Sequence, residues 1–175
     1  MKNKEVKKSL MYLSGEDFYL FCYAVFIALD SLNCKNGKYF SDYRKLAFLI
    51  EFIKDEKLNY IISNSSEKSL NPIDKEYLFR SYSVGLGRRS EILKLLFTLE
   101  KRNYVILDKG NTRSLVNVSL NNEAIPEGFF NKEVFSKEYR NMASFSGYVK
   151  RLSVLKLDTM IERVYRNNGI STWAI

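Results

Sequence analysis

The feature that most constrains the fold of this chain is an apolar run near its start, FYLFCYAVFIAL, from Phe18 to Leu29. The run has no charged side chain, and only two tyrosine hydroxyls and one thiol interrupt its hydrocarbon. It is too short to span a bilayer, because a transmembrane helix needs about 20 apolar residues. A helix without a polar face is buried on every side, so the run predicts a buried helix.

The cover of this predicted helix has two alternatives. The helix should extend from about Asp17, after the acidic start Ser14-Gly15-Glu16-Asp17, to Leu32, before the Asn36-Gly37 turn signal. Either the C-terminal arm of the same chain covers it, or another subunit does, as in obligate interfaces. The surplus of apolar faces elsewhere in the chain favours another subunit.

The middle of the chain has the element order of a winged helix-turn-helix. The predicted elements are a helix starting at Ser41 or Asp42 and ending near Lys54, a short strand over 58–63, a helix opened by Asn71-Pro72, a break at 85–87, a helix over 88–102, and a hairpin of 104–108 with 114–120 around Gly110-Asn111. A helical arm over about 131–167 should follow, either broken near Ser153 or continuous and buried on two sides.

The predicted fold class is therefore mainly α with a small β-hairpin (α+β). We expect one compact unit of three parts: the N-terminal apolar helix in 1–40, the winged helix-turn-helix in 41–120, and the C-terminal helical arm in 121–175. The length of 175 residues is sufficient for a real core.

The residue types for common catalytic chemistry are missing from the sequence. It has no histidine, which removes the commonest general base and most zinc sites. Cys22 and Cys34 lack CxxC spacing, and on one helix they would lie roughly 18 Å apart, too far for a disulfide. Gly85-Leu86-Gly87 completes no phosphate-binding motif. We predict a non-enzyme without cofactor or metal, in a reducing cytoplasm and not bound to membranes.

The net charge of +8 permits contact with nucleic acids. The candidate contacts to DNA phosphates are Arg88, Arg89 and Lys94 on the 88–102 helix, and Lys109 and Arg113 in the wing. The outward face of this helix carries Glu91 in its first turn and has no Asn or Gln to read bases. These features favour nonspecific DNA contact over sequence-specific recognition.

Apolar side chains outside the predicted core stripes are candidates for contact with a protein partner. They are Phe18, Phe21, Val25, Phe48, Phe52, Leu93 and Phe97.

This layout resembles the middle components of ABC-three-component systems, the group that includes Lamassu-type antiviral defence. The resemblance depends on the apolar first helix, on SDYRKLAFLIEFI (41–53), and on YLFRSYSVGLGRRSEILKLLFTLEKRNYVIL (77–107) followed by the wing. It implies a non-catalytic winged-helix accessory subunit that binds an SMC- or Rad50-like ATPase and an effector, often a nuclease, in a bacterial anti-phage or anti-plasmid complex. The alternative, favoured by charge and element order, is a free-standing winged-helix DNA-binding transcriptional regulator.

Overall fold

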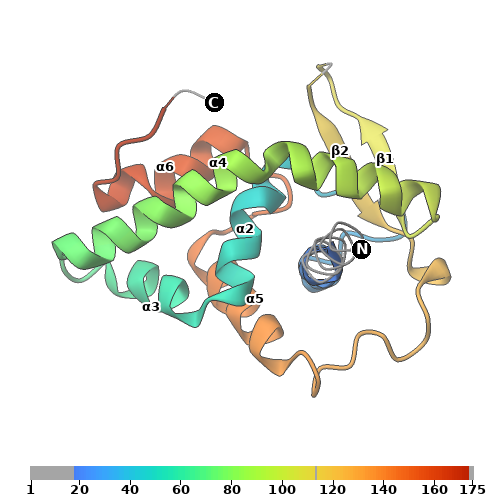
Figure 1. Ribbon diagram of the computed structural model, residues 1–175, viewed down its shortest axis with the longest axis horizontal. Helices are drawn as coiled ribbons and strands as arrows, with labels where there is room; N and C mark the ends of the chain where they lie inside the picture. The colour runs from blue at the N-terminus through green and yellow to red at the C-terminus, as the bar shows by residue number, and fades with distance from the viewer. Residues whose placement is uncertain (1–17, 113, 174–175) are drawn as a thin grey trace, which may run out of the picture.

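The structure is a computed structural model that describes residues 18–112 and 114–173. Residues 18–31 are helical and are named here the N-terminal helical segment. The further elements are α2 (Arg44–Lys54), α3 (Glu56–Asn64), α4 (Pro72–Lys101), β1 (Val105–Lys109), β2 (Val116–Leu120), η1 (Asn122–Ala124), α5 (Ser136–Tyr148), α6 (Leu157–Val164) and η2 (Arg166–Asn168) (Figure 1). The prediction of a mainly helical chain with a small antiparallel sheet is confirmed.

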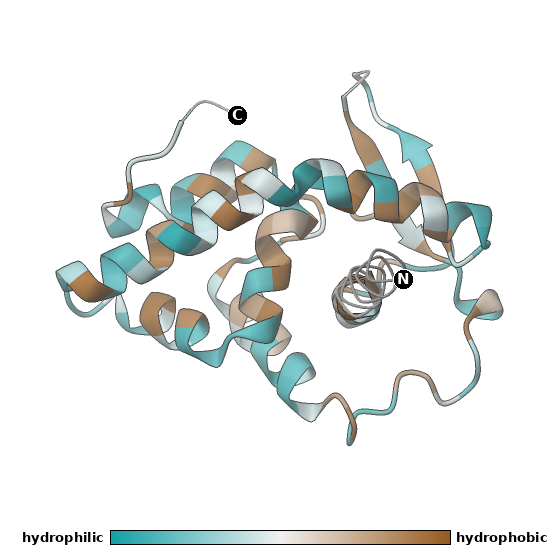
Figure 2. Cartoon of the chain, viewed as in Figure 1, coloured by the Kyte–Doolittle hydropathy of each residue, from teal (hydrophilic) through white to brown (hydrophobic). Residues whose placement is uncertain are grey.

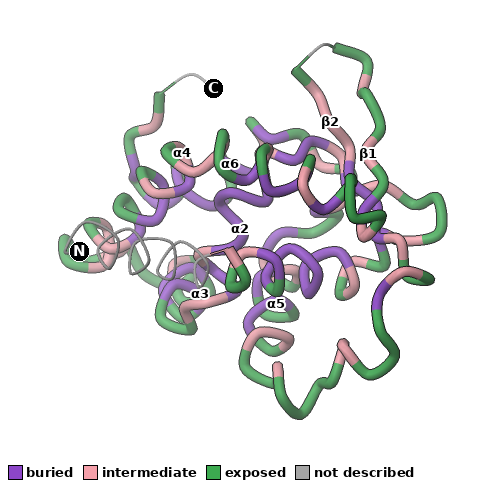
Figure 3. Tube along the Cα trace, turned by 45° about the vertical axis from the view of Figure 1, so that its right-hand side comes forward, coloured by how far each residue is buried: buried purple, intermediate pink, exposed green. Residues whose placement is uncertain are grey.

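Helix α2 lies at the centre of the fold, where α3, α4, α5 and α6 pack around it (Figures 1 and 3). It begins two residues after the predicted cap Asp42, whose carboxylate accepts a hydrogen bond from the backbone N–H of Arg44 at 3.2 Å. Nearly every side chain of α2 is buried. A single cluster of buried apolar side chains includes residues from all three predicted parts of the chain.

The burial of α2 corrects part of the predicted partner surface. Phe48 and Phe52 are fully buried, with Phe48 stacked on Tyr82 and Phe52 packed on Phe145 at 4.6 Å between ring centroids. Val25 in the N-terminal helical segment is also fully buried. These three residues therefore belong to the core. Each lies outside the predicted core stripes, but neighbouring elements cover that side of its helix as well.

The helices on either side of residue 70 differ from the prediction at two points. Residues 58–63 form most of α3 and not a strand, because Asp55 caps that helix by accepting a hydrogen bond from the backbone N–H of Lys57 at 2.8 Å. The predicted break at 85–87 does not occur, and α4 continues for 30 residues. Its predicted start is confirmed, since Asn71 caps it through the backbone N–H of Asp74 at 2.8 Å.

Gly85 explains why a glycine pair lies inside α4. A Cβ atom at this position would lie 2.4 Å from Cδ1 of the Phe48 ring, so only glycine lets α4 approach α2 this closely. At Gly87 an added Cβ would meet no heavy atom within 4 Å. The two glycines therefore differ in role, although they are two residues apart in one helix.

This difference gives a matched pair of stability predictions. Gly85→Ala should lower the free energy of unfolding by about 1–2 kcal/mol, because overpacking outweighs the better helix propensity of alanine. Gly87→Ala should raise it by about 0.5–1 kcal/mol, since only the propensity changes. Urea denaturation of both variants measures these effects. A change of the same sign in both would contradict the close contact between α4 and Phe48.

The predicted hairpin is confirmed, with β1 and β2 paired antiparallel in the register Val105 with Leu120. The other edge of β2 is also occupied, by the irregular segment 34–43, which forms isolated bridges at Lys35 and Phe40. Phe40 exchanges backbone hydrogen bonds with Val118 at 2.8 and 2.9 Å, and the N–H of Tyr43 donates to the carbonyl of Val116 at 2.8 Å. β2 therefore lies between β1 and the segment that precedes α2.

The chain itself covers most of the N-terminal helical segment. The loop between β2 and α5 passes around this segment (Figure 1) and contributes Phe129 and Phe135. Phe129 lies 5.5 Å from both Phe26 and Tyr23, and Phe135 lies 5.4 Å from Tyr23, between ring centroids. Residues 24–29 are all buried, and all but Ile27 are members of the core cluster. The chain itself therefore covers these residues, with its C-terminal part contributing Phe129 at Phe26, and the preference for another subunit is wrong for them.

The C-terminal arm is broken between α5 and α6, which confirms the first of its two alternatives. The turn between these helices is fixed by the buried Lys45 of α2, whose Nζ donates to the carbonyls of Leu152 and Leu155 at 2.7 Å each. After α6, Trp173 stacks on Tyr82 of α4 at 5.8 Å between ring centroids, and its backbone N–H donates to the Tyr82 hydroxyl at 3.0 Å.

In the part of the chain that the structure describes, no helix combines the length and the apolar character needed to cross a membrane.

Candidate functional site

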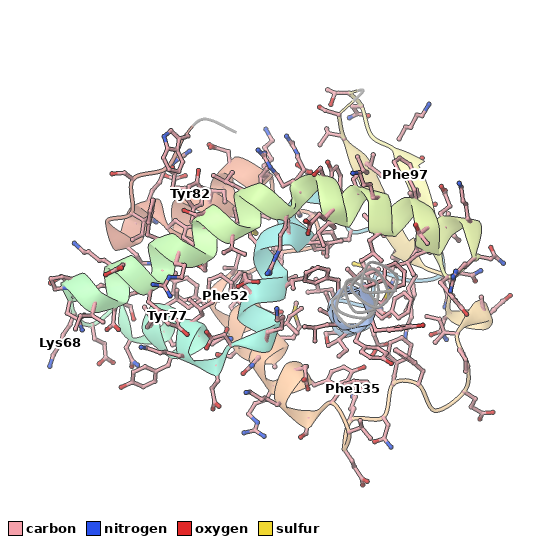
Figure 4. All side chains as sticks on the ribbon, viewed as in Figure 1. Phe52, Lys68, Tyr77, Tyr82, Phe97 and Phe135 are labelled. Atoms are coloured by element: carbon pink, nitrogen blue, oxygen red, sulfur yellow. The ribbon has the colours of Figure 1, made fainter. Side chains whose placement is uncertain are left out.

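A cleft of about 740 Å³ lies between the N-terminal helical segment and α4. It is lined by Phe18, Phe21, Val84, Gly87, Arg88, Glu91, Lys94, Leu95 and Thr98. Four residues predicted separately, as partner contacts or as phosphate contacts, are thus brought together: Phe18, Phe21, Arg88 and Lys94. The cleft exists because helical residues 18–31 run beneath the C-terminal half of α4 and cross it (Figures 1 and 4).

Two lining residues of the cleft, Arg88 and Phe21, also belong to a small network of charged and aromatic groups with α2. The Arg88 guanidinium forms an ion pair with the carboxylate of Glu51 on α2 and lies 5.0 Å from the centroid of the Phe21 ring. Lys54 lies 5.6 Å from the same centroid and 3.9 Å from the Glu51 carboxylate. Because Glu51 neutralises Arg88 within the fold, this arginine has less charge to offer to a phosphate.

The two walls of the cleft differ in chemistry. One wall presents the half-buried rings of Phe18 and Phe21. The other presents the exposed side chains of Glu91 and Lys94 from α4, one of each charge. An apolar wall facing a mixed-charge wall suits a polypeptide segment with one apolar and one polar side.

The remaining candidates for DNA contact do not form one surface with the cleft. Arg89 is half-buried and its Nε donates to the carbonyl of Leu86 at 3.4 Å. Lys109 is exposed at the end of β1 and lines a second cleft against the turn before α6. Arg113 lies outside the described residues. The structure therefore provides no continuous basic surface from the described members of this set.

Leu93 and Phe97, the other two candidates for partner contact, lie on α4 but outside the cleft. Leu93 is half-buried, and Phe97 is 47% exposed. Figure 4 shows Phe97 on the side of α4 that faces away from the N-terminal helical segment. They belong to a different face of the helix.

Sequence reasoning missed Glu51 as a part of this site. In the sequence, Glu51 stands near Arg44, Lys45 and Lys54, which is the ordinary context of a solvated helix surface. Its role depends on α2 and α4 lying side by side, which no short-range pattern reports. The opposite charges of Glu51 and Arg88 become a signal only after these two helices are known to pack together.

The thiols of the two cysteines and clusters of acidic side chains are the remaining candidates for reactive sites. Burial raises the pKa of both Cys22 and Cys34 to about 11, which keeps these thiols protonated near neutral pH. Within residues 18–112 and 114–173, no cluster of three or more Cys, Asp or Glu side chains is placed to hold a metal ion.

Comparisons of the chain with protein-family models, with curated proteins and with solved structures find no match.

Proposed function

We propose that this protein is a non-catalytic interaction subunit of a multiprotein complex, and that the cleft between the N-terminal helical segment and α4 binds a segment of a partner. The observation that carries this proposal is the ion pair of Arg88 with Glu51, in which the Arg88 guanidinium also lies against the Phe21 ring. The cleft offers apolar area and paired charges, which complement a polypeptide better than a phosphate backbone.

The fold supports this proposal as a variant of the winged helix-turn-helix. In this interpretation the first helix is the N-terminal helical segment, the isolated bridge of Phe40 with Val118 stands in place of the short strand, and the hairpin β1–β2 is the wing. Helix α2 and the second half of α4 are the following two helices, and α3 with the first half of α4 is an insertion between them. This interpretation would shift the winged helix-turn-helix, predicted from sequence over 41–120, towards the N-terminus.

The resemblance to middle components of ABC-three-component systems suggests the partners. We propose an SMC- or Rad50-like ATPase and an effector such as a nuclease, in a bacterial anti-phage or anti-plasmid complex. In such an assembly the chain would couple the ATPase to the effector through surfaces of its own and would perform no chemistry.

Purification of the tagged chain at its native expression level from its own cell tests this proposal. An SMC- or Rad50-like ATPase should copurify in near-stoichiometric amount with the unmodified chain. Glu91→Arg reverses a charge in the cleft and leaves the core intact, so it should reduce ATPase recovery by about tenfold or more, equivalent to about 1.4 kcal/mol. Ile73→Arg is the matched control, because Ile73 is 73% exposed on α4 outside the cleft.

The second candidate function, a DNA-binding regulator, is favoured by the net charge of +8, by the exposed Lys94 on α4 and by the exposed Lys109 in the hairpin. It predicts a chain that is stable on its own and binds one DNA sequence at physiological salt. That result, together with no ATPase in the purified material, would overturn the proposed function.

A further inference from the structure

A third cleft, of about 300 Å³, lies where the chain turns from α5 into α6. Four of its lining residues are cations, and this set is named here the turn cluster: Lys150, Arg151, Lys156 and Arg163. All four are exposed, and the other lining residues are uncharged. The lining of this cleft therefore carries charge of one sign.

This charge balance differs from that of the cleft in the proposed function. There, Arg88 is paired with Glu51, and Glu91 stands close to Lys94 in the same lining. Among the ion pairs of the described residues, none uses a member of the turn cluster. The positive charge of the turn cluster is therefore available to a ligand.

The acids of the neighbouring hairpin cleft do not line the third cleft, although the two clefts share three lining residues. Two of the three aspartates in the hairpin cleft have cationic partners elsewhere: Asp42 pairs with Arg44 at 2.7 Å, and Asp158 pairs with Arg166 at 3.0 Å. The third, Asp108, is exposed on β1. These carboxylates limit the basic surface on its hairpin side, and the turn cluster is its centre.

The backbone at Arg151 is unusual for an arginine. Among the described residues, five other than glycine have a positive φ; four of these are asparagine or aspartate, and the fifth is Arg151 at 60°. Short polar side chains tolerate this left-handed conformation, whereas a longer side chain is strained in it and glycine is not. Arginine therefore costs stability at this position. A cost that the fold does not explain favours a binding role for the exposed guanidinium.

The turn that presents the cluster has a fixed backbone. The carbonyl of Arg151 accepts hydrogen bonds from the N–H groups of Val154 and Leu155 at 3.1 and 2.9 Å. The buried Lys45 holds the same turn through the Leu155 carbonyl, as described above. Nη1 of Arg163 donates to the carbonyl of Lys150 at 3.4 Å and so connects α6 to the turn.

Helix α6 contributes its polar side to the cleft. Hydrophobic and hydrophilic positions are mixed along α6 (Figure 2), and its buried side chains are Leu157, Met160, Ile161 and Val164. Arg163 lines the cleft together with Thr159, one turn earlier, and Glu162 does not line it.

The composition of the cleft selects among anionic ligands. Cations without balancing acids complement phosphate groups. The lining has no aromatic ring on which the bases of a single strand could stack, so a duplex fits better. Its one largely exposed apolar side chain is Val154, at 58%, which is too little for the apolar centre of a protein interface.

We propose that the turn cluster binds the phosphate backbone of a nucleic-acid duplex without regard to sequence. The proposal goes beyond the proposed function, because the third cleft shares no residue with the cleft between the N-terminal helical segment and α4. It also differs from the second candidate function, which requires recognition of one DNA sequence.

Fluorescence anisotropy of the full chain with labelled DNA duplexes of about 20 base pairs tests this proposal. Two duplexes of unrelated sequence should bind equally at about 50 mM salt. The logarithm of the affinity should fall with the logarithm of the salt concentration with a slope of about −3.6, if all four cations contact phosphates. Arg151→Gly should weaken binding about fivefold and make the slope shallower by about 1. The same variant should raise the midpoint of thermal unfolding by about 2 °C, because glycine relieves the left-handed backbone.

Lys132→Gln is the matched control for the loss of one charge. Lys132 is exposed and precedes the start of α5, whereas the turn cluster follows the end of that helix. This variant should leave the affinity within about twofold of the unmodified chain.

Four outcomes would overturn the proposal. They are no binding of DNA up to about 100 μM at about 50 mM salt, unchanged affinity in a folded Arg151→Gly protein, an equal loss in Lys132→Gln, and tighter binding of polyglutamate or of phosphatidylserine vesicles than of DNA at the same salt. The last outcome would assign the turn cluster to an acidic protein or to a membrane surface.

Discussion

Replacing Phe52 by alanine should lower the free energy of unfolding by about 3–5 kcal/mol, as the removal of a fully buried aromatic ring does in other cores. The ring has no exposed surface and packs on Phe145 at 4.6 Å and on Tyr165 at 6.3 Å between centroids. Helices α3, α4, α5 and α6 pack around α2, so the surrounding side chains can collapse only partly into the space left behind. Urea denaturation followed by circular dichroism measures the loss.

Phe97→Ala provides the control for this prediction. It removes the same ring from a position that is 47% exposed, so the free energy of unfolding should change by no more than about 0.5–1 kcal/mol. A loss below about 1 kcal/mol for Phe52→Ala would place Phe52 outside the core. It would then restore Phe52 as a candidate for partner contact.

The same comparison decides how partner surfaces should be mapped. Substitution of Phe48 or Phe52 would weaken complex formation by destabilising the chain, whether or not a partner is near. Exposed positions such as Glu91 in the cleft and Phe97 on α4 avoid this ambiguity. They separate loss of binding from loss of fold, because neither side chain belongs to the core.

The sequence correctly predicted the elements whose structure is determined by residues close to them in the chain. The hairpin follows from two β-rich runs around Gly110-Asn111, and the start of α4 follows from Asn71-Pro72. The failure at α3 could also have been avoided, because Asp55 before Leu58, Ile61 and Ile62 is a cap followed by helical spacing. The β-rich composition of residues 58–63 favoured a strand, whereas the spacing of their apolar side chains fits a helix.

Errors that depend on long-range packing could not have been avoided in this way. Gly85 was interpreted as a helix breaker, but it is the contact point of α4 with Phe48 on a helix almost 40 residues earlier. Phe48 and Phe52 lie off the predicted stripe of α2, and they are buried because α2 is surrounded. The cleft likewise required Glu51 and Arg88 to meet across two helices. A single sequence contains the residues of these contacts but not the pairing of the helices that makes them.

Lys45 carries the second prediction of large effect, because it is a fully buried lysine without a carboxylate partner. Its Nζ donates to the carbonyls of Leu152 and Leu155 and lies 4.4 Å from the centroid of the Phe40 ring. None of the ion pairs among the described residues includes it. Burial lowers the pKa of Lys45 from its ordinary value of 10.5 to about 8, opposed mainly by the negative charge of Asp42.

The sign of the pH dependence follows from this lowered pKa. Between pH 8 and 10.5 the unfolded chain holds a proton on Lys45 that the folded chain has released, so the contribution of Lys45 to stability rises with pH. The full difference corresponds to about 3 kcal/mol. A neutral amine still has two N–H groups, one for each of the two carbonyls at 2.7 Å, so deprotonation removes the cost of the buried charge and keeps these hydrogen bonds.

Lys45→Met should therefore destabilise the protein more at high pH than at neutral pH. At pH 7 the loss of two donors, about 1–3 kcal/mol for each carbonyl left unpaired, is offset by the removal of a buried charge. By pH 10.5 that offset is gone, and the destabilisation should be about 3 kcal/mol larger than at pH 7.

The Lys45→Met protein and the protein that keeps Lys45 should both carry Cys34→Ala. This removes the Cys34 thiol, whose pKa is raised to about 11 and which therefore makes stability fall above pH 9. Lys94→Met, at an exposed position of α4, is the matched control. Urea denaturation at several pH values gives the difference, and an effect of Lys45→Met that stays constant from pH 7 to 10.5 would show that Lys45 is not buried as a charge in the folded chain.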